Sequence, residues 1–411
     1  MDATARTITI NVTTANDAPV NTVPSSQSIS EDNSLVFSTG NSNLISIADV
    51  DGGSSSVQVT LTATHGTLTL SGTSGLSFSF SDANGTGAGD GTADTTMTFR
   101  GTITNINAAL GGLTYTPATN YNGSASVEII TNDLGNAGYG GPKTDTDSVS
   151  ITVNAVNDAP VITVPGAQTV NEDGTLVLSP GNGNAVSIAD ADAGSSALEM
   201  TIGTNMYVTL NLNGISGLTF SEGDGTADAY MAFTGTLANI NAALNGISFV
   251  PDPNWHGAYL IVNITIDDQG NTGGGSLTDS EYFYIVVNSV NDAPSGANNT
   301  VYTSQDTDYV FSTSDFGFSD SIDGDAFLAV KITTLPTTGT LYWNNGSSWV
   351  AVTANQFISA SDISAGKLKY TPPASYTGSP TFTFKVQDDG GTDFGGIDLD
   401  PIANTMTISV T

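Results

Sequence analysis

Acidic residues recur in one order along this 411-residue chain. A Glu-Asp pair comes first, then an Asp-x-Asp, then an acidic turn before a closing strand, and last an Asn-Asp pair followed by Ala-Pro. The Asn-Asp pair stands at 16–17, 157–158 and 291–292, which is a domain-sized period. Ca²⁺ accepts irregular cages of about six to eight carboxylate and carbonyl oxygens, whereas Mg²⁺ prefers a stricter octahedron. The pattern therefore predicts Ca²⁺ at joints between domains, with the linker Asp as a ligand.

The excess of acidic residues limits the classes of partner that the chain can bind. The chain carries 7 basic and 40 acidic residues, a net charge of −33, and no Lys or Arg lies between Asn157 and Asn291. Nucleic acid and anionic membranes are bound through basic patches, so both are excluded as partners. The chain has no cysteine, which excludes disulfides, thiolate zinc and a thiol nucleophile.

Targeting signals are missing from the sequence. No apolar run approaches the roughly 20 residues of a membrane helix, so direct membrane insertion is not expected. The start, MDATARTITINV, lacks the basic and apolar regions of a secretory signal. We expect a bacterial extracellular or cell-surface protein whose signal lies elsewhere, or an excised piece of a longer chain.

Short alternating stretches such as SVQVTLTA and SVSITVNAV, separated by Gly, Asn, Asp and Pro, predict an all-β fold. About seven strands fall in each repeat, as in an immunoglobulin-like β-sandwich, and the repeats would form an extended tandem array. The segments TNINAAL (104–110) and ANINAAL (238–244) are the only convincing helical signals, each one or two turns long.

The repeats divide the chain into four parts. Residues 1–15 match the closing strand of a preceding repeat, and complete repeats are expected at 16–156, 157–290 and 291–411. The unpartnered strand indicates either a cut from a longer array or a strand donated to another chain. No repeat lacks its own closing strand, which favours the cut.

Strand direction predicts which acids meet. In a sandwich with alternating strands, the Glu-Asp pair lies at the far end of its repeat, whereas the Asp-x-Asp and the acidic turn lie at the near end of the next. Bare carboxylates gathered in this way would repel one another by several kcal/mol, at roughly 4 kcal/mol per close pair near a protein surface. The predicted ligands at the second joint are Asn157, Asp158, Glu31, Asp32, Asp190, Asp192, Asp267 and Asp268. Those at the third joint are Asn291, Asp292, Glu172, Asp173, Asp323, Asp325, Asp388 and Asp389. An incomplete first joint would use Asp17, Asp49, Asp51 and Asp133.

The ordered set of four acidic motifs resembles the calcium motifs of cadherin repeats. The VNDAP phrase and the GDGTAD…NINAAL…TYTP…NYNG layout resemble the tandem cadherin-like repeats of giant bacterial surface adhesins, often exported by type I secretion. The third repeat is more similar to the cadherin-like repeats named after chondroitin sulfate proteoglycans. The resemblance covers nearly the whole chain and implies a calcium-stiffened stalk that acts in adhesion or biofilm formation, with neighbouring repeats as its partners. The third repeat departs from the pattern in having Gln305-Asp306 in place of Glu-Asp.

Four alternatives remain open. The acids could be a merely solvated surface, and the GDGTAD insertions (Asp90, Asp94; Asp224, Asp228) could be plain turns or hold an extra ion. The chain could instead be a module that binds a carbohydrate, a protein or a cell-surface ligand, or the subunit of a self-assembling extracellular filament. Sugar-stacking candidates are Tyr342, Trp343 and Trp349, although buried strand aromatics are the more ordinary interpretation.

An enzyme is not expected. His65 and His256 fall at different places in their repeats, and neither has a Ser or Cys partner motif. His256 is the middle residue of an aromatic corner at Trp255, and an anchoring role for the corner is the simpler interpretation. A glycosidase needs two carboxylates in one cleft, whereas here they recur in turns.

Overall fold

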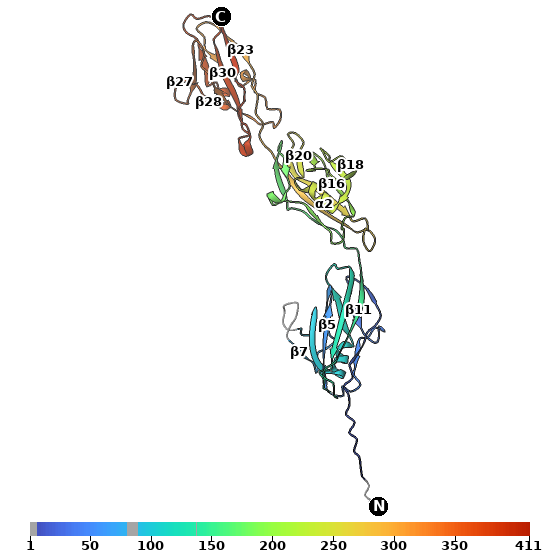
Figure 1. Cartoon of the computed structure of the whole chain (residues 1–411). Coiled ribbons are helices and arrows are strands. Elements are labelled where there is room, and N and C mark those ends of the chain that lie inside the picture. The colour runs from blue at the N-terminus through green and yellow to red at the C-terminus, as the bar shows by residue number, and fades with distance from the viewer. Residues whose placement is uncertain (1–5, 80–88, 137) are drawn as a thin grey trace, which may run out of the picture.

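A computed structural model describes residues 6–79, 89–136 and 138–411. Three β domains follow one another in an elongated row, and the first described residues lie at the opposite end from the C-terminus (Figure 1). Each domain has its own hydrophobic core, within residues 35–153, 162–287 and 301–410. The prediction of an all-β fold in tandem sandwiches is confirmed, and the boundaries predicted at 156/157 and 290/291 fall between the cores.

The first domain has a six-stranded sheet of order β2-β11-β10-β5-β8-β7, a three-stranded sheet β3-β9-β6 and the pair β1-β4. Its elements are β1 (Val20–Thr22), β2 (Gln27–Ser30), β3 (Leu35–Phe37), β4 (Ser46–Ala48), β5 (Ser56–Ala63), β6 (Gly66–Thr69), β7 (Ser77–Ser79), β8 (Thr96–Thr102), α1 (Ile103–Leu110), β9 (Leu113–Pro117), β10 (Gly123–Asn132) and β11 (Thr144–Asn154).

The second domain repeats this plan, with sheets β13-β22-β21-β16-β19-β18 and β14-β20-β17 and the pair β12-β15. Its elements are β12 (Val161–Thr163), β13 (Gln168–Asn171), β14 (Leu176–Val177), the 3₁₀ turn η1 (Pro180–Asn182), β15 (Ser187–Ala189), β16 (Ala197–Thr204), β17 (Val208–Asn211), β18 (Thr219–Glu222), β19 (Tyr230–Thr236), α2 (Leu237–Leu244), β20 (Ser248–Pro251), β21 (Gly257–Asp267) and β22 (Thr278–Asn288).

The third domain pairs a five-stranded sheet, β23-β31-β30-β25-β28, with a four-stranded one, β24-β29-β26-β27. Its elements are β23 (Asn299–Thr303), β24 (Tyr309–Val310), η2 (Thr313–Phe316), β25 (Phe327–Ile332), β26 (Thr340–Asn344), β27 (Trp349–Ala351), β28 (Gln356–Ser359), α3 (Ala360–Ser364), β29 (Leu368–Thr371), β30 (Thr381–Asp388), η3 (Asp393–Gly395) and β31 (Asn404–Val410). The expected count of about seven strands per repeat is too low, because several strands are broken into short pieces.

Alternation along the strands builds each core. On β5 the apolar residues Val57, Val59 and Leu61 are almost fully buried, while the polar residues between them face outward. The closing strand β11 runs antiparallel to β10 and parallel to β2, so it ties both ends of the domain together. The paired strands therefore fix where the turns that carry the acids lie.

The short helices position an acidic loop. The Thr102 hydroxyl accepts from Asn105 N at 3.3 Å and caps α1. From α1, the Asn107 side chain bonds both backbone groups of Ile47, each at 2.8 Å, two residues before Asp49. Asn241 on α2 holds the backbone of Ile188 before Asp190 in the same way, at 2.9 and 2.8 Å. The predictions of α1 and α2 are confirmed, whereas the sequence analysis misses α3.

Residues 6–14, expected to be a strand, have no regular secondary structure and are exposed. Ile8, Ile10 and Val12 are 80–88% exposed. Within the described residues, pairing begins at Ala15, which bridges Tyr139. Residues 1–5 of the predicted strand lie outside the described residues. No helix among the described residues is long and apolar enough to span a membrane.

Candidate metal centre

Three joints carry the acids. We call them the leading joint (Asn16, Asp17), the middle joint (Asn157, Asp158) and the distal joint (Asn291, Asp292). In each, the backbone N–H of the linker Asp donates to a carboxylate of the domain that follows. These hydrogen bonds join Asp17 to Asp51 (3.0 Å), Asp158 to Asp192 (3.1 Å) and Asp292 to Asp323 (2.6 Å).

The Asp-x-Asp forms a tight loop at the first two joints. Asp49 Oδ1 accepts from the N–H groups of Asp51 and Gly52, each at 3.1 Å, and Asp190 Oδ1 accepts from the corresponding groups at 3.1 and 2.9 Å. The other oxygen of each, Asp49 Oδ2 and Asp190 Oδ2, is buried without a hydrogen-bond partner. Burial, and then the neighbouring Asp51 or Asp192, raises the pKa of both carboxyls.

At the distal joint the predicted alignment of this motif is wrong. Asp320 Oδ1 accepts from Asp323 N (3.2 Å) and Gly324 N (3.3 Å), so Asp320 takes the place of Asp49 and Asp190. The loop is one residue longer there, which moves the partner acid to i+3. Asp325 is an additional acid whose pKa is raised by burial and then by Asp320, Asp323 and Asp389.

The linker Asn side chains hold the acidic turns. Asn16 Nδ2 donates to Asp133 Oδ2 and Asn157 Nδ2 to Asp268 Oδ2, both at 2.6 Å, and Asn291 Nδ2 donates to Asp388 Oδ1 at 2.9 Å. Burial alone would raise the pKa of Asp133 and Asp268. Two backbone N–H groups on each, at 2.7–2.9 Å, together with the Asn amide outweigh burial and lower both pKa values.

Two of the predicted turn acids have other roles. Asp267 Oδ1 accepts from Gln269 N and Ser276 Oγ, each at 2.6 Å, so it caps its turn. Because neighbours on a strand face opposite ways, Asp267 lies on the other face of β21 from buried Asp268 and away from the middle joint. Asp389 Oδ1 accepts from Ala326 N at 2.7 Å. Of the two acids predicted in each turn, the equivalent ones are therefore Asp268 and Asp388, which both bond the linker Asn.

Acids of the preceding domain reach across both complete joints. Glu31 Oε1 accepts from Val156 N at 2.7 Å, and Glu172 Oε1 accepts from Val290 N. Burial and then Asp32, Asp192 and Glu31 raise the pKa of Asp158. Burial and then Asp323, Asp173, Glu172 and Asp320 raise the pKa of Asp292. Each linker carboxylate thus faces acids from both of the domains it joins.

His256 lies at the distal joint, which the sequence analysis missed. Its Nδ1 is 3.2 Å from Oε2 of Glu172, whose side chain is 1% exposed, while the His side chain is 50% exposed. His256 also lines a hollow of about 340 Å³ with Asn291, Asp323 and Asp325. The corresponding corner of the first domain has Asn122. The sequence signal that could have placed His256 at the joint was its position immediately after the anchoring Trp255.

The leading joint is different because no upstream domain contributes acids within the described residues. Lys143 Nζ donates there to the backbone carbonyl of Asn16. The second domain has Leu277 at the corresponding position, where its N–H bonds Asp268. The leading joint therefore has a side-chain cation of its own.

Unpartnered oxygens converge on these joints. The described residues hold eight buried side-chain polar atoms without a hydrogen-bond partner, and seven belong to the joints. They are Asn16 Oδ1, Asp49 Oδ2, Asp51 Oδ1, Asp190 Oδ2, Asn291 Oδ1, Asp320 Oδ2 and Asp388 Oδ2. Carboxylate and amide oxygens left bare in this way fit a hard, oxygen-liganding cation such as Ca²⁺. Among the described residues, however, no three His, Asp or Glu side chains are already close enough together to form a cage.

The GDGTAD insertions fit plain turns. Asp94 Oδ2 accepts from Gly91 N at 2.8 Å, and Asp228 Oδ2 accepts from Gly225 N at 2.8 Å. Asp90 and Asp224 cap the same turns through Thr92 N and Thr226 N. These carboxylates are used locally.

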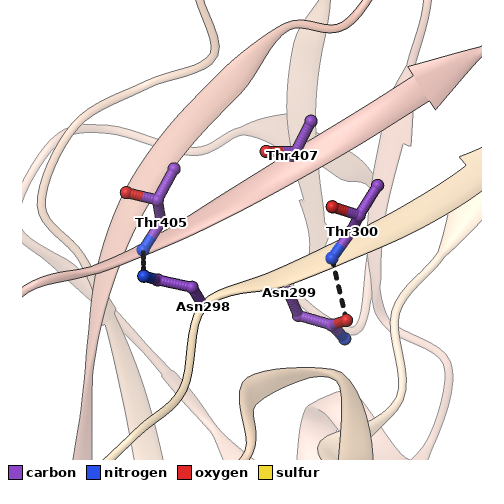
Figure 2. A pocket seen from close by; sticks show the side chains of 5 residues that line it. All are labelled: Asn298, Asn299, Thr300, Thr405 and Thr407. Atoms are coloured by element: carbon purple, nitrogen blue, oxygen red, sulfur yellow. Dashed lines mark hydrogen bonds between the residues drawn. The ribbon is translucent and has the colours of Figure 1, made fainter.

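Another hollow, of about 510 Å³, lies on the third domain (Figure 2). Its lining residues are Asn298, Asn299, Thr300, Thr405 and Thr407. Asn298 Oδ1 accepts from Thr405 N at 2.6 Å, and Asn299 Oδ1 accepts from Thr300 N at 2.8 Å. With no carboxylate in its lining, this hollow is not a candidate cation site.

Comparisons with known proteins give loose structural likenesses. No family model and no curated protein sequence matches the chain. Human CDH23 EC21-23 is 12% identical with a TM-score of 0.34, and the match covers 93% of this chain and 97% of that one. Mouse Protocadherin-24 EC1-3 is also 12% identical at 0.34, covering 84% and 90%, and the titin domains I67-I69 are 10% identical at 0.20, covering 96% and 98%. The fold assignment rests on the sheets of the chain itself.

Proposed function

We propose that this chain is a calcium-stiffened extender segment of a bacterial extracellular adhesin. The observation that carries the proposal is the concentration of unpartnered buried oxygens at the joints, seven of the eight among the described residues. Acids from both neighbouring domains face Asp158 and Asp292, which ties the proposed sites to the relative placement of the domains. The bacterial surface location and the role in adhesion or biofilm formation rest on the resemblance of the repeated motifs.

The contacts at each joint support a choice of residues that would hold the ions. At the middle joint they are Glu31, Asp32, Asp158, Asp190 and Asp192, with Asn157 and Asp268 fixing the turn behind them. At the distal joint they are Glu172, Asp173, Asn291, Asp292, Asp320, Asp323, Asp325 and Asp388. Bound Ca²⁺ supplies positive charge that removes the repulsion among the carboxylates. With the repulsion removed, the linker residues between the two domains would keep the domains in a fixed relative orientation.

A structural role is proposed in preference to catalysis or sugar binding at the third domain. Trp343 Nε1 donates to Asp362 Oδ2 at 3.0 Å, which fixes its indole. Lys369 Nζ lies 4.5 Å from the centre of the Trp349 ring and 5.8 Å from that of Tyr342. The sugar-stacking candidates of the third domain are thus already engaged within the protein.

Small-angle X-ray scattering with and without millimolar Ca²⁺ tests the proposal. With calcium we expect a rod, since three domains with strands of this length reach roughly 100 Å or more in line. With chelator we expect a broader, shorter distribution of distances. Identical profiles in both conditions, for the wild type and for Asp292→Ala, would overturn the proposal.

A further inference from the structure

One sheet face of the second domain carries exposed tyrosines that the extender role does not use. Tyr259 is 70% exposed, Tyr282 53% and Tyr230 47%, and Tyr284 is partly exposed between the first two. The Tyr259 and Tyr284 ring centres are 6.0 Å apart, and those of Tyr282 and Tyr284 are 5.5 Å apart, each pair close to perpendicular. These four residues are here called the tyrosine face.

The sheet register places the face on adjacent strands. Tyr230, Gly203, Asn263 and Tyr282 lie side by side across β19, β16, β21 and β22. At about 4.8 Å per strand, this row spans roughly 14 Å. A Cβ atom on Gly203 would approach Tyr230 Cδ2 to 2.7 Å, so the Tyr230 ring rests on the glycine. The face can accommodate an oligomer, because it is wider than one small ring.

The first domain shows that the fold does not require these rings. The positions of Tyr282 and Tyr284 on the closing strand are occupied there by Ser148 and Ser150, and that of Tyr230 by Thr96. The first-domain ladder between β10 and β11 runs without a break, whereas β21 has a bulge between Gly257 and Leu260. The bulge adds one residue and presents Tyr259.

Tyr259 has a strained backbone. Its φ is +72°, a region that bulky residues rarely adopt. Bulges re-aim side chains and are frequent at functional sites, and strain of this kind persists where the surrounding structure enforces it. The second domain therefore has backbone strain at Tyr259 that the first domain lacks, and this strained conformation places an exposed ring beside Tyr284.

The charges around the tyrosine face favour a neutral ligand. The second domain has fourteen acidic residues and no Lys or Arg, yet the outward positions between and directly beside the tyrosines on β16, β21 and β22 are neutral. They are Ile261 beside Tyr284, then Gly203 and Asn263, then Thr201, Thr265 and Ser280 in the next row. In the row of Thr201 the first acid is Glu222 on the edge strand β18, which pairs with Ala232, and Glu199 and Asp267 lie one row further. An anionic ligand is repelled by the domain as a whole, and a cationic one finds a counter-charge only at the edge of this face, on Glu222.

We propose that the tyrosine face binds a neutral oligosaccharide. A sugar ring has an apolar C–H face that packs on aromatic rings, and its hydroxyls suit the tyrosine hydroxyls, the Asn263 amide and the linked Thr265 and Ser280 hydroxyls, which are 2.9 Å apart. The site lies within one domain and shares no residue with the joints. It is therefore independent of the calcium proposal.

Isothermal titration and saturation-transfer NMR with cellohexaose, mannohexaose and dextran test this, with alginate as the anionic probe, all in chelator. We expect at least one neutral glycan to bind and alginate not to bind. In the double variant Tyr282→Ser and Tyr284→Ser, which installs the first-domain residues, binding should weaken tenfold or more. The thermal melt should stay close to that of the wild type.

Tyr302→Ser is the matched control, since Tyr302 is 71% exposed on a strand of the third domain, and this variant should bind as the wild type does. The proposal is overturned if none of the neutral glycans binds, or if the double variant binds equally well. A concentration-dependent dimer that the double variant abolishes, without glycan binding, would instead make the face a protein interface. If glycan binds while calcium leaves the scattering profile unchanged, only the extender proposal fails.

Discussion

The middle and distal joints have the same order of acids but satisfy them differently. At the middle joint Asp268 receives two backbone N–H groups and the Asn157 amide, and its pKa is lowered. At the distal joint Asp388 is fully buried, its Oδ2 has no partner, and its pKa is raised by burial and then by Asp320 and Asp325. Asp268 thus has two backbone donors, whereas Asp388 has one, Gly390 N at 3.0 Å, besides the Asn291 amide, and burial and like charges outweigh these donors. Equivalent places in the sequence can thus differ in how much they depend on a bound cation.

The number of unpartnered oxygens also indicates that the distal joint depends on a cation more than the middle joint does. Three unpartnered oxygens lie at the distal joint, on Asn291, Asp320 and Asp388, against one at the middle joint, on Asp190. At the distal joint the side chains of Asp325 and Asn291 also close over Gly390, where a Cβ atom would come within 2.0 and 2.2 Å of their oxygens. A cation should therefore stabilise the distal joint more than the middle one.

The largest expected effect is that of removing calcium. A cation at about 100 times its Kd adds about 2.7 kcal/mol per site. For domains of this size that shifts Tm by about 10 °C. The second domain contributes acids to both joints, so the first and third domains give the comparison. Differential scanning calorimetry in chelator should show the third domain losing more stability than the first, with Mg²⁺ restoring less than Ca²⁺. Equal shifts in the first and third domains would break the comparison between the joints.

The next largest effect is loss of a linker carboxylate. Asp292→Ala and Asp158→Ala each remove a carboxylate that faces acids from two domains. Each should weaken calcium binding about tenfold or more in isothermal titration, or about 1.4 kcal/mol. Asp267→Asn is the control: because Asp267 caps a turn on the other face of β21, affinity should not change. If Asp267→Asn weakened binding as much as Asp158→Ala, the placement of Asp267 away from the joint would be wrong.

Asp320 and Asp325 test the corrected alignment. In the wild type, Asp320 holds the loop through Oδ1, and its Oδ2 has no hydrogen-bond partner. Asp320→Asn removes this carboxylate, so its loss of calcium affinity should be several-fold and equal to that of Asp190→Asn. Asp325→Asn should lose less, because Asp325 is an additional acid without a counterpart in the second domain. Calcium titrations of the three variants give the comparison. The reverse order for Asp320→Asn and Asp325→Asn would restore the original alignment.

Effects of opposite sign on folding stability are expected for the turn acids in the absence of metal. Asp268→Asn weakens charge-assisted hydrogen bonds and should lower stability by about 1–2 kcal/mol at neutral pH. Asp388→Asn removes a buried carboxylate with a bare oxygen, so stability should stay equal or rise. Chemical denaturation in chelator measures both. Equal losses would show that Asp388 is as well satisfied as Asp268.

The pH dependence of these two acids follows from the directions of their pKa shifts. The folded pKa of Asp268 lies below 3.8, so its contribution is present above 3.8 and is lost as pH falls through the folded value. The folded pKa of Asp388 lies above 3.8, so its penalty is present above that raised value and is relieved as pH falls toward 3.8. As the metal-free chain is acidified, the penalty of Asp388 in the third domain should therefore be relieved before the stabilising contribution of Asp268 is lost. Asp388→Asn should remove the first trend, and Asp268→Asn the second.

Much of the fold was predictable because it depends on local periodicity. Alternation predicts the strands, and the capped NINAAL segments predict α1 and α2. The breaks in the strands were missed because they occur in all three domains through packing between the sheets. Helix α3 was missed because Ser359, whose hydroxyl accepts from Asp362 N, is not followed by a NINAAL segment.

The candidate site was predictable in its order of acids but not in its register. A loop longer by one residue replaced Asp325 with Asp320, and the pleat of β21 turned Asp267 away while Asp268 faced the joint. His256 contacts Glu172, which is 84 residues away along the chain, through a corner whose position only the packed sheets determine. Such errors of a few residues are what spacing alone cannot correct.

The smallest expected effect belongs to His256. The His side chain is half exposed, and Glu172 keeps the Val290 N–H bond without it. His256→Asn, which installs the first-domain residue, should therefore change stability by less than about 1 kcal/mol and leave the calcium shift in Tm intact. Melts of this variant with and without Ca²⁺, beside Asn122→His in the first domain, measure it. A loss of the calcium shift as large as in Asp292→Ala would mean that His256 holds Glu172 in place for the ion, and the distal joint would then differ from the middle one in its supporting residues as well as in its acids.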